Sequence, residues 1–209
     1  MKFYDCSTAP SPRRVRIFLA EKGIEILTVE IDLAGGEQFS DAFLRLNPRG
    51  TVPVLVLEDG TAISEASAIC RYIEAAYPEP RLMGRTPAEQ GIVAMWDHYC
   101  EQEGFFAAAE ALRNAARRLE GHALTGRDGY PQIPALVERG RTRVQRFLAS
   151  LDERLAGSRY VAGEQFTIAD ITALVTVDFA ARLRLPLPDA SAAARRWYEE
   201  INARPSTTG

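Results

Sequence analysis

Two neighbouring segments constrain this chain most: residues 47–55 (NPRGTVPVL) and residues 63–73 (ISEASAICRYI). The first places a proline at the start of a strand, and the second places an acidic residue at the start of a helix. Val52-Pro53 therefore offers an edge on which an extended peptide can dock, and Glu65 offers a pocket for that peptide's charged end. The chain is expected to hold a peptide-like ligand at this point.

Composition excludes several classes of partner. The 209 residues are 46% hydrophobic and 25% charged, as in an ordinary globular protein. A formal net charge of -3 gives no electrostatic case for nucleic acid or an anionic membrane. No run of about 20 apolar residues predicts a membrane span, and no signal peptide is expected at the N-terminus. Three widely spaced cysteines without a CxxC motif favour a reducing cytoplasm.

The first part of the chain, residues 1–77, alternates strand and helix signals. Period-two patterns, an Asp59-Gly60 turn signal and helix ends marked by proline or glycine define the elements. Strands are predicted at 2–6, 27–31, 54–57 and 61–63. A helix with Pro12 in its first turn and Gly23 after its last turn is predicted, with further helices over 41–46 and over 65–76. The order βαβ, helix, ββα is that of a thioredoxin-like domain.

The rest of the chain is predicted to be helical. Residues 78–86 carry prolines and a glycine and are expected to form a linker before an all-helical domain at 87–209. Thr86-Pro87-Ala88-Glu89 is a capping box that starts a helix extending to about Leu119. A break at 121–134 precedes helices at 135–155 and 192–203. Between them, Thr167 and Asp170 form a second N-terminal box, which is expected to cap a helix of the core.

The residues alone allow two interpretations of Pro53 and two of Glu65. A trans proline at the start of an edge strand is the commoner case, since cis bonds are about 5–6% of X–Pro bonds. If Pro53 is cis, Val52 turns its N–H and C=O outward for antiparallel pairing with a peptide. Glu65 either interacts with the helix dipole or receives an ammonium group, while the helix N–H groups beside it bind a carboxylate.

Val52-Pro53, Glu65 and the Thr167/Asp170 box, in this order and at these distances, resemble the cytosolic glutathione S-transferases. The resemblance covers almost the whole chain, and the first loop has some features of the bacterial nu class. It implies a cis Pro53, with Val52 binding glutathione's cysteinyl unit and Glu65 its γ-glutamyl end. It also implies a thioredoxin-like domain followed by the family's helical C-terminal domain, and a homodimer that uses glutathione as co-substrate.

The chain departs from the family beside Glu65. The family pair is Glu-Ser, in which the serine hydroxyl contacts the γ-glutamyl carboxylate, whereas this chain reads Glu65-Ala66-Ser67. The N–H of Ala66 can still donate, and Ser67 can add a hydroxyl. Loss of one charged hydrogen bond costs about 1.5–3 kcal/mol, so weaker binding is expected rather than none.

A larger departure lies in the first loop, where the serine- and cysteine-type transferases carry their thiol-activating residue at the position of Ala9. Alanine offers no side-chain donor, and a free thiol with a pKa of about 8.5 is mostly protonated at pH 7. Ser11 is the preferred substitute, because nu-class relatives place a thiol-contacting polar residue there. Ser7, Thr8 and Tyr4 are the alternatives, and each of the loop hydroxyls can instead belong to an N-cap or turn residue.

Three functions are therefore considered. The first is a glutathione transferase that conjugates the thiolate to a small, hydrophobic electrophile. The second is a glutathione-dependent disulfide reductase, which the nu-class features favour. The third is a non-catalytic glutathione-binding module, which Ala9 and Ala66 favour. No metal is expected, since His98 and His122 lack partners at ligand spacing.

Overall fold

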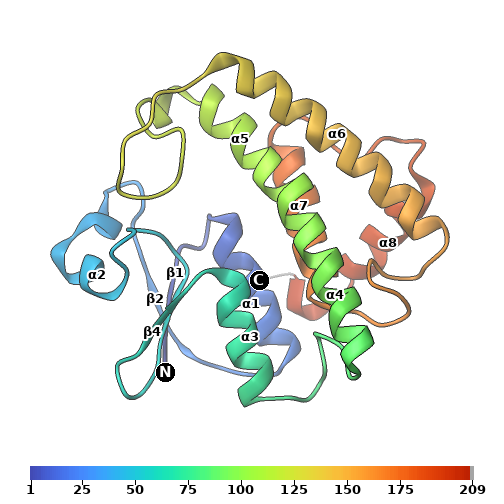
Figure 1. The fold of residues 1–209 in the computed structure, drawn as a ribbon, viewed down its shortest axis with the longest axis horizontal. Coiled ribbons are helices and arrows are strands. Elements are labelled where there is room, and N and C mark those ends of the chain that lie inside the picture. The colour runs from blue at the N-terminus through green and yellow to red at the C-terminus, as the bar shows by residue number, and fades with distance from the viewer. Residues whose placement is uncertain (208–209) are drawn as a thin grey trace. The chain divides into compact units, whose positions relative to one another are not determined.

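The computed structural model describes residues 1–207, which form two compact units. The first unit comprises Met1–Pro80 together with Leu124–Gly129 (Figure 1). The second comprises Arg81–Ala123 and the described residues from Tyr130 onward. The first unit ends within residues 78–86, and it also includes Leu124–Gly129, which follow Arg81–Ala123 of the second unit in the sequence.

The first unit is a four-stranded sheet with three helices. Its elements are β1 (Lys2–Asp5), α1 (Pro10–Glu21), β2 (Leu27–Glu30), α2 (Asp41–Leu46), β3 (Val54–Val56), β4 (Ala62–Ser64) and α3 (Ala66–Ala76). The strand order is β2-β1-β3-β4, in which β1 is parallel to β2 and the other pairs are antiparallel. The predicted order βαβ, helix, ββα is therefore confirmed, with ends that differ by one or two residues.

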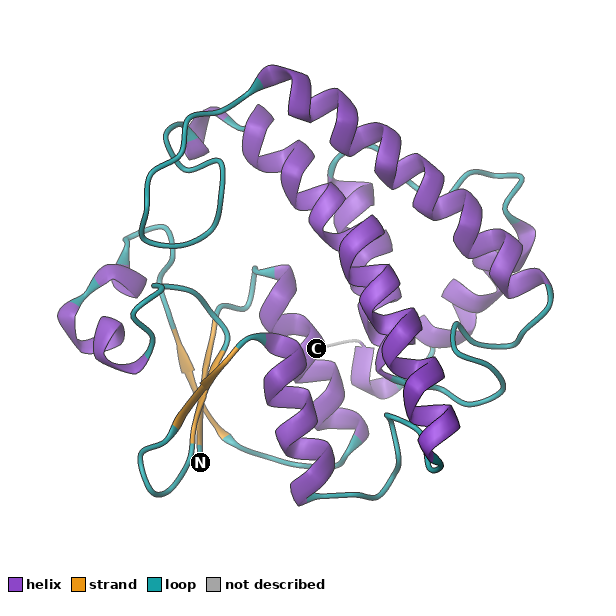
Figure 2. Ribbon diagram, in the orientation of Figure 1, coloured by secondary structure: helices purple, strands orange, loops and turns teal. Residues whose placement is uncertain are grey.

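The sheet of the first unit carries helices on both faces, with α2 on one side and α1 and α3 on the other (Figure 2). Alternation along β1 explains this arrangement, since successive side chains point to opposite faces. Phe3 is 1% exposed, while Tyr4 packs on the other face in a cluster with Phe43, Ile31 and Val54. Pro12 lies in the first turn of α1, as expected, although the helix begins two residues earlier.

The second unit is helical. It contains α4 (Pro87–Tyr99), a π-helical segment (Cys100–Phe105), α5 (Phe106–Ala115), α6 (Pro134–Ala156), α7 (Ile168–Arg182) and α8 (Ala192–Asn202). Helix α7 is almost entirely buried, from Ile168 to Ala180, and it packs against α4, the π-helical segment and α5. This position confirms the prediction that it belongs to the core.

The helix predicted from Pro87 to about Leu119 is wrong in two respects. It passes through the π-helical segment, where Gly104 lets the backbone approach Phe147 and Thr176 closely. It also ends at Ala115, because Ala116 adopts an extended conformation (φ -80°, ψ 115°) before a 3-10 turn at Arg117–Leu119.

Both capping boxes form as predicted. The N–H of Glu89 donates to Thr86 Oγ1 (3.2 Å), and the N–H of Thr86 donates to Glu89 Oε2 (3.3 Å). The buried Asp170 carboxylate accepts from the Thr167 N–H (2.9 Å), the Val161 N–H (2.8 Å) and Trp197 Nε1 (3.0 Å). Burial raises the pKa of Asp170 to about 6, although these hydrogen bonds oppose the shift.

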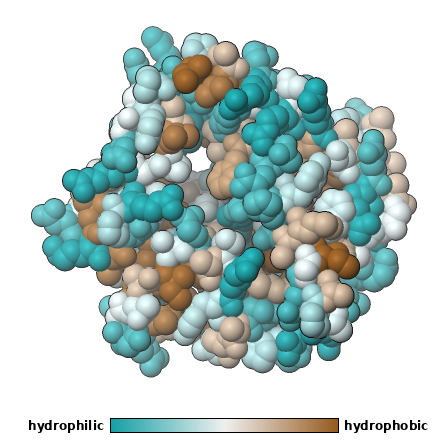
Figure 3. Space-filling model, in the orientation of Figure 1, coloured by the Kyte–Doolittle hydropathy of each residue, from teal (hydrophilic) through white to brown (hydrophobic). Residues whose placement is uncertain are grey.

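On the face that Figure 3 shows, hydrophilic residues cover much of the surface and apolar residues gather in small groups. Across residues 1–207, no helix is both long enough and apolar enough to cross a bilayer.

Candidate functional site

Strand register brings three segments to one end of the sheet. Tyr4 is paired with Val54, so the antiparallel alignment places the loop after β1 beside Val52. Val54 is in turn paired with Ser64, so Val52-Pro53 and Glu65 lie beyond the same end of the β3–β4 ladder. The loop at residues 6–9, the loop before β3 and the start of α3 therefore share one edge of the sheet.

The backbone of Val52 is available for pairing. The Val52–Pro53 peptide bond is cis, as the family resemblance implied. Val52 is half-buried, and within residues 1–207 neither its N–H nor its C=O has a hydrogen-bond partner. The Val52 N–H can therefore donate to an extended peptide placed alongside, and the Val52 C=O can accept from it, without displacing an existing hydrogen bond.

Asn47 organises the loop that leads to Val52. Its buried side chain donates through Nδ2 to the Thr51 carbonyl (2.8 Å), while its Oδ1 accepts from the Arg49 N–H (3.1 Å). Gly50 has φ 63° and lies against Phe39, so a Cβ at this position would come within 2.8 Å of the ring. Hydrogen bonds of Asn47 and the close packing of Gly50 therefore define the conformation of this loop.

The start of α3 carries strain and unpaired donors. Glu65 has φ 73° and ψ 126°, a conformation that side-chain-bearing residues rarely adopt and that costs of order 1–3 kcal/mol. Its side chain does not cap the helix, and within the described residues the N–H groups of Ala66, Ser67 and Ala68 have no partners. Such donors at a helix N-terminus favour an anion. The half-buried Ser67 also has an unpaired hydroxyl within residues 1–207.

The carboxylate of Glu65 is paired with a residue that the sequence analysis did not single out. Arg49 Nη1 lies 2.7 Å from Glu65 Oε1, and the two side chains are 65% and 54% exposed. The residues are 16 positions apart, and only the turn at Gly50 and the β3–β4 hairpin bring them together, so no sequence periodicity signals the contact.

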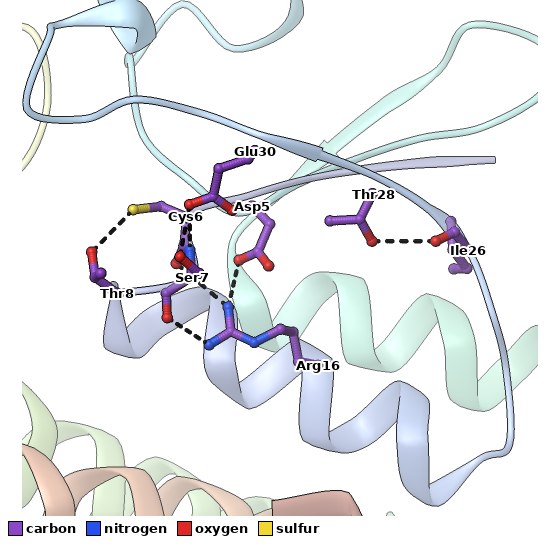
Figure 4. Close-up of polar contacts among 8 residues, drawn as sticks. All are labelled: Asp5, Cys6, Ser7, Thr8, Arg16, Ile26, Thr28 and Glu30. Atoms are coloured by element: carbon purple, nitrogen blue, oxygen red, sulfur yellow. Dashed lines mark hydrogen bonds and ion pairs between the residues drawn. The ribbon is translucent and has the colours of Figure 1, made fainter. Parts of the chain in front are cut away.

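Ser7 points toward β2 and is anchored there (Figure 4). Its N–H and hydroxyl both donate to Glu30 Oε1, at 2.8 and 2.9 Å. Its carbonyl accepts from Arg16 Nη2 (3.0 Å), and Arg16 Nη1 donates to Asp5 Oδ1 (2.7 Å). Burial raises the pKa of the Asp5 carboxyl above its usual value, with Arg16 opposing the shift. These contacts give Ser7 a structural task in holding the loop.

Ser11 differs from Ser7 because its hydroxyl makes no hydrogen bond within the described residues. It is half-buried in the first turn of α1, and neither its N–H nor its hydroxyl has a partner within the described residues. Pro10 and Pro12 on either side have no N–H, and Ala9 donates its own to the Cys6 carbonyl (2.9 Å). Ser11 is thus the main source of unused donors in this turn.

Tyr4 lies in β1, and its ring packs edge-on against Phe43 at a centroid distance of 6.1 Å. This places it within the cluster on the α2 face of the sheet. The ring therefore has a packing role, and its hydroxyl has no hydrogen-bond partner within residues 1–207.

The cysteines are free thiols and all three are buried. The sulfur of Cys6 lies 3.4 Å from Thr8 Oγ1 at the end of β1 (Figure 4). Burial, reinforced by Asp97 and Asp170, raises the pKa of Cys100 well above its ordinary value, which makes it a poor nucleophile. The part of the chain that the structure describes holds no group of three or more His, Cys, Asp or Glu residues arranged to bind a metal.

Comparison with known proteins gives the family. Residues 8–76 match the glutathione S-transferase N-terminal domain, and residues 95–205 match the glutathione S-transferase C-terminal domain. Glutathione S-transferase 2 of Saccharomyces cerevisiae is 37% identical over 99% of this chain and 87% of its own length.

Solved structures agree with these matches. A glutathione S-transferase domain-containing protein from Marinobacter aquaeolei is 35% identical, with a TM-score of 0.92 over the full length of both chains. A glutathione S-transferase of class Gtt2 from Vibrio parahaemolyticus is 34% identical, with a TM-score of 0.85 over 100% of this chain and 96% of its own. The chain therefore belongs to the cytosolic glutathione S-transferase family and is a glutathione S-transferase enzyme with a thioredoxin-like domain followed by a helical domain.

Proposed function

We propose that this enzyme binds glutathione along the edge formed by Val52, Glu65 and the start of α3, and transfers its thiolate to a small, hydrophobic electrophile. The observation that carries the proposal is the set of unpaired groups at this edge. They are the backbone N–H and C=O of Val52 and the N–H groups of Ala66, Ser67 and Ala68. A tripeptide that carries a carboxylate and an ammonium at one end complements these groups.

Each part of glutathione has a proposed partner. The cysteinyl unit pairs antiparallel with Val52, whose position the cis Pro53 bond and the Asn47 loop define. The ammonium of the γ-glutamyl unit binds Glu65. Its carboxylate binds the N–H groups that begin with Ala66, and the hydroxyl of Ser67 adds a donor.

Ser11 is the proposed activator of the thiol. A shift of the thiol pKa from about 8.5 to about 6.5 needs about 2.7 kcal/mol. A helix N-terminus supplies about 0.3–1 kcal/mol, and the two prolines in this turn reduce its donors. A hydroxyl donor to the thiolate supplies much of the remainder. The hydroxyl and the N–H of Ser11 are both available to donate hydrogen bonds to the thiolate. The Ser7 hydroxyl already donates to Glu30, and the Tyr4 ring packs against Phe43.

Catalysis then consists of positioning and activation. The thiolate sulfur forms a bond to an electrophilic carbon, and the displaced group leaves with its electron pair. We infer glutathione as the sole co-substrate, no metal, a homodimer and a cytoplasmic location, where glutathione is reduced.

Disulfide reduction is the second candidate, and one observation favours it. Ala9 removes the hydroxyl or thiol that the serine- and cysteine-type transferases use, and the replacement, Ser11, corresponds to the position used in the disulfide-reducing nu class. In that reaction the bound thiolate attacks one sulfur of a small disulfide and expels the other as a thiolate. The third hypothesis, a module without turnover, is not retained, because the family is one of enzymes.

The proposal is tested by titrating the ultraviolet thiolate absorbance of protein-bound glutathione against pH. A bound-thiol pKa at least one unit below about 8.5 is expected. Glutathione that binds with an unshifted pKa would contradict thiol activation at this site, and absence of binding would refute the site itself. The rates of turnover of a model aryl halide and of a small disulfide are then compared. Faster turnover of the aryl halide supports the transferase, and faster turnover of the disulfide supports the reductase.

A further inference from the structure

Arg49 and Glu65 form an ion pair that leaves both groups with unused hydrogen-bonding capacity. Arg49 Nη1 donates to Glu65 Oε1 at 2.7 Å. Within residues 1–207, the other guanidinium N–H groups and Glu65 Oε2 have no partners, although a guanidinium carries five donors in a planar fork. Both side chains are more than half exposed, so a ligand can reach them.

The base of the Arg49 side chain is fixed from two directions. The Arg49 N–H donates to Asn47 Oδ1 (3.1 Å), within the loop that the buried Asn47 holds together. On the other side, Gly126 approaches the Arg49 carbonyl so closely that a Cβ at 126 would lie 3.3 Å from its oxygen. Arg49 therefore presents its guanidinium from a defined backbone position.

A contribution to folding stability does not explain the ion pair between Arg49 and Glu65. An exposed ion pair contributes little to folding, and Glu65 occupies a strained conformation (φ 73°) while making it. Strain at a charged, exposed residue beside unpaired helix donors is more readily explained by ligand binding than by folding.

We propose that Arg49 binds the α-carboxylate of the γ-glutamyl unit while Glu65 binds its ammonium. This inference rests on the proposed function and adds a specificity residue to it. An α-amino acid carries both charges on one carbon, so an adjacent guanidinium and carboxylate match it as a reciprocal pair. Arginine binds carboxylates through two parallel hydrogen bonds. Arg49 thus replaces the family's serine hydroxyl, which Ala66 lacks.

The test combines a residue change with a ligand change. Calorimetry measures the affinity of the wild type and of Arg49→Ala for glutathione and for an analogue whose γ-glutamyl α-carboxylate is an amide. Loss of a charged hydrogen bond predicts a roughly 10- to 100-fold weaker affinity of Arg49→Ala for glutathione. The same substitution is expected to change the affinity for the amide analogue less than about 3-fold.

Two further variants provide controls. Arg45→Ala removes an exposed cation on α2 that makes no contact with Glu65, and it is expected to leave both affinities unchanged. Arg49→Lys keeps the charge but not the fork, and an intermediate affinity for glutathione is expected. The melting temperature of each variant is expected to stay within about 4 °C of the wild type.

The outcomes separate this inference from the proposed function. An equal loss of affinity for glutathione and the amide analogue in Arg49→Ala, or no loss for either, overturns the role of Arg49 and leaves the proposed site intact. A wild-type protein that does not bind glutathione refutes the proposed function and this inference together.

Discussion

Glu30 accepts two hydrogen bonds from Ser7, one from its N–H at 2.8 Å and one from its hydroxyl at 2.9 Å. The same carboxylate oxygen thus ties the loop after β1 to the end of β2, on the opposite strand edge from Val52. This pairing separates the preferred candidate of the sequence, Ser11, from its alternative, Ser7, because it occupies Ser7 and leaves Ser11 with unused donors.

Substitution of these two serines is expected to have unequal effects on catalysis. Ser11→Ala removes the proposed donor to the thiolate, so the pKa of bound glutathione is expected to rise by about one unit and kcat/KM at pH 6.5 to fall about 10-fold. Ser7→Ala leaves the backbone bond to Glu30 in place, and a change of less than about 3-fold is expected. Thiolate titration and steady-state kinetics measure both. A larger loss in Ser7→Ala than in Ser11→Ala contradicts the assignment.

Replacement of Glu65 is expected to reveal its backbone strain. At φ 73° glycine is unstrained but alanine is not, so Glu65→Gly is expected to be more stable than Glu65→Ala by about 1 kcal/mol. Glu65 is the N-cap residue of α3, and glycine is also preferred over alanine at an N-cap, so both effects favour Glu65→Gly. Urea denaturation measures the difference, and both variants are expected to bind glutathione at least 10-fold more weakly than the wild type. If Glu65→Ala equals or exceeds Glu65→Gly in stability, the backbone carries no strain.

Substitution by alanine is expected to have opposite effects on stability at two glycines, Gly91 in α4 and Gly104 in the π-helical segment that follows α4. In Gly104→Ala the new Cβ would lie 2.6 Å from Thr176 Cγ2 and 2.9 Å from the Phe147 ring, and a loss of about 1–3 kcal/mol is expected. Gly91 lies in α4 with nothing within 4 Å of such a Cβ, so Gly91→Ala is expected to gain about 0.5–1 kcal/mol. Thermal or chemical unfolding tests the pair. A stable Gly104→Ala protein is incompatible with the close packing of the π-helical segment.

The buried Asp170 carboxylate predicts a specific pH dependence. Its pKa rises from 3.8 to about 6 on folding, so between these values the native state binds more protons than the unfolded state. The contribution of Asp170 to stability therefore falls as pH rises from about 4 to 6, by a total of about 3 kcal/mol. Asp170→Asn lacks this titration and is less stable throughout, because an amide cannot accept from all the donors present.

The observable is the difference in unfolding free energy between the wild type and Asp170→Asn, measured by urea denaturation from pH 4 to pH 7. This difference is expected to shrink as pH rises. Asp128→Asn, which changes a carboxylate on the exposed surface, is measured in parallel as a control for the change of net charge. A difference that grows with pH means that Asp170 is ionised more easily in the folded protein than in the unfolded chain.

Much of the fold was predictable because it depends on local chemistry. Alternation of apolar and polar residues marks the strand at Leu27–Glu30, since successive side chains of a strand point to opposite faces. The Thr86/Glu89 box marks a helix start because two side chains satisfy two backbone donors within one turn. Val52-Pro53 and Glu65 could be located as candidate binding residues for the same reason, as strand and helix beginnings can be recognised from neighbouring residues.

Other features depend on contacts between residues far apart in the chain. Ser7 and Glu30 are 23 positions apart and meet through the parallel register of β1 and β2, and Arg49 reaches Glu65 only because the loop turns at Gly50. In the π-helical segment, Gly104 packs closely against Thr176 and Phe147, and the helical pattern does not reveal this contact. The sequence by itself thus determined most of the elements and the place of the candidate site, because caps and periodicity are local. The tertiary structure decided which hydroxyl is occupied and which charge faces Glu65, because those partners are set by register and loop geometry.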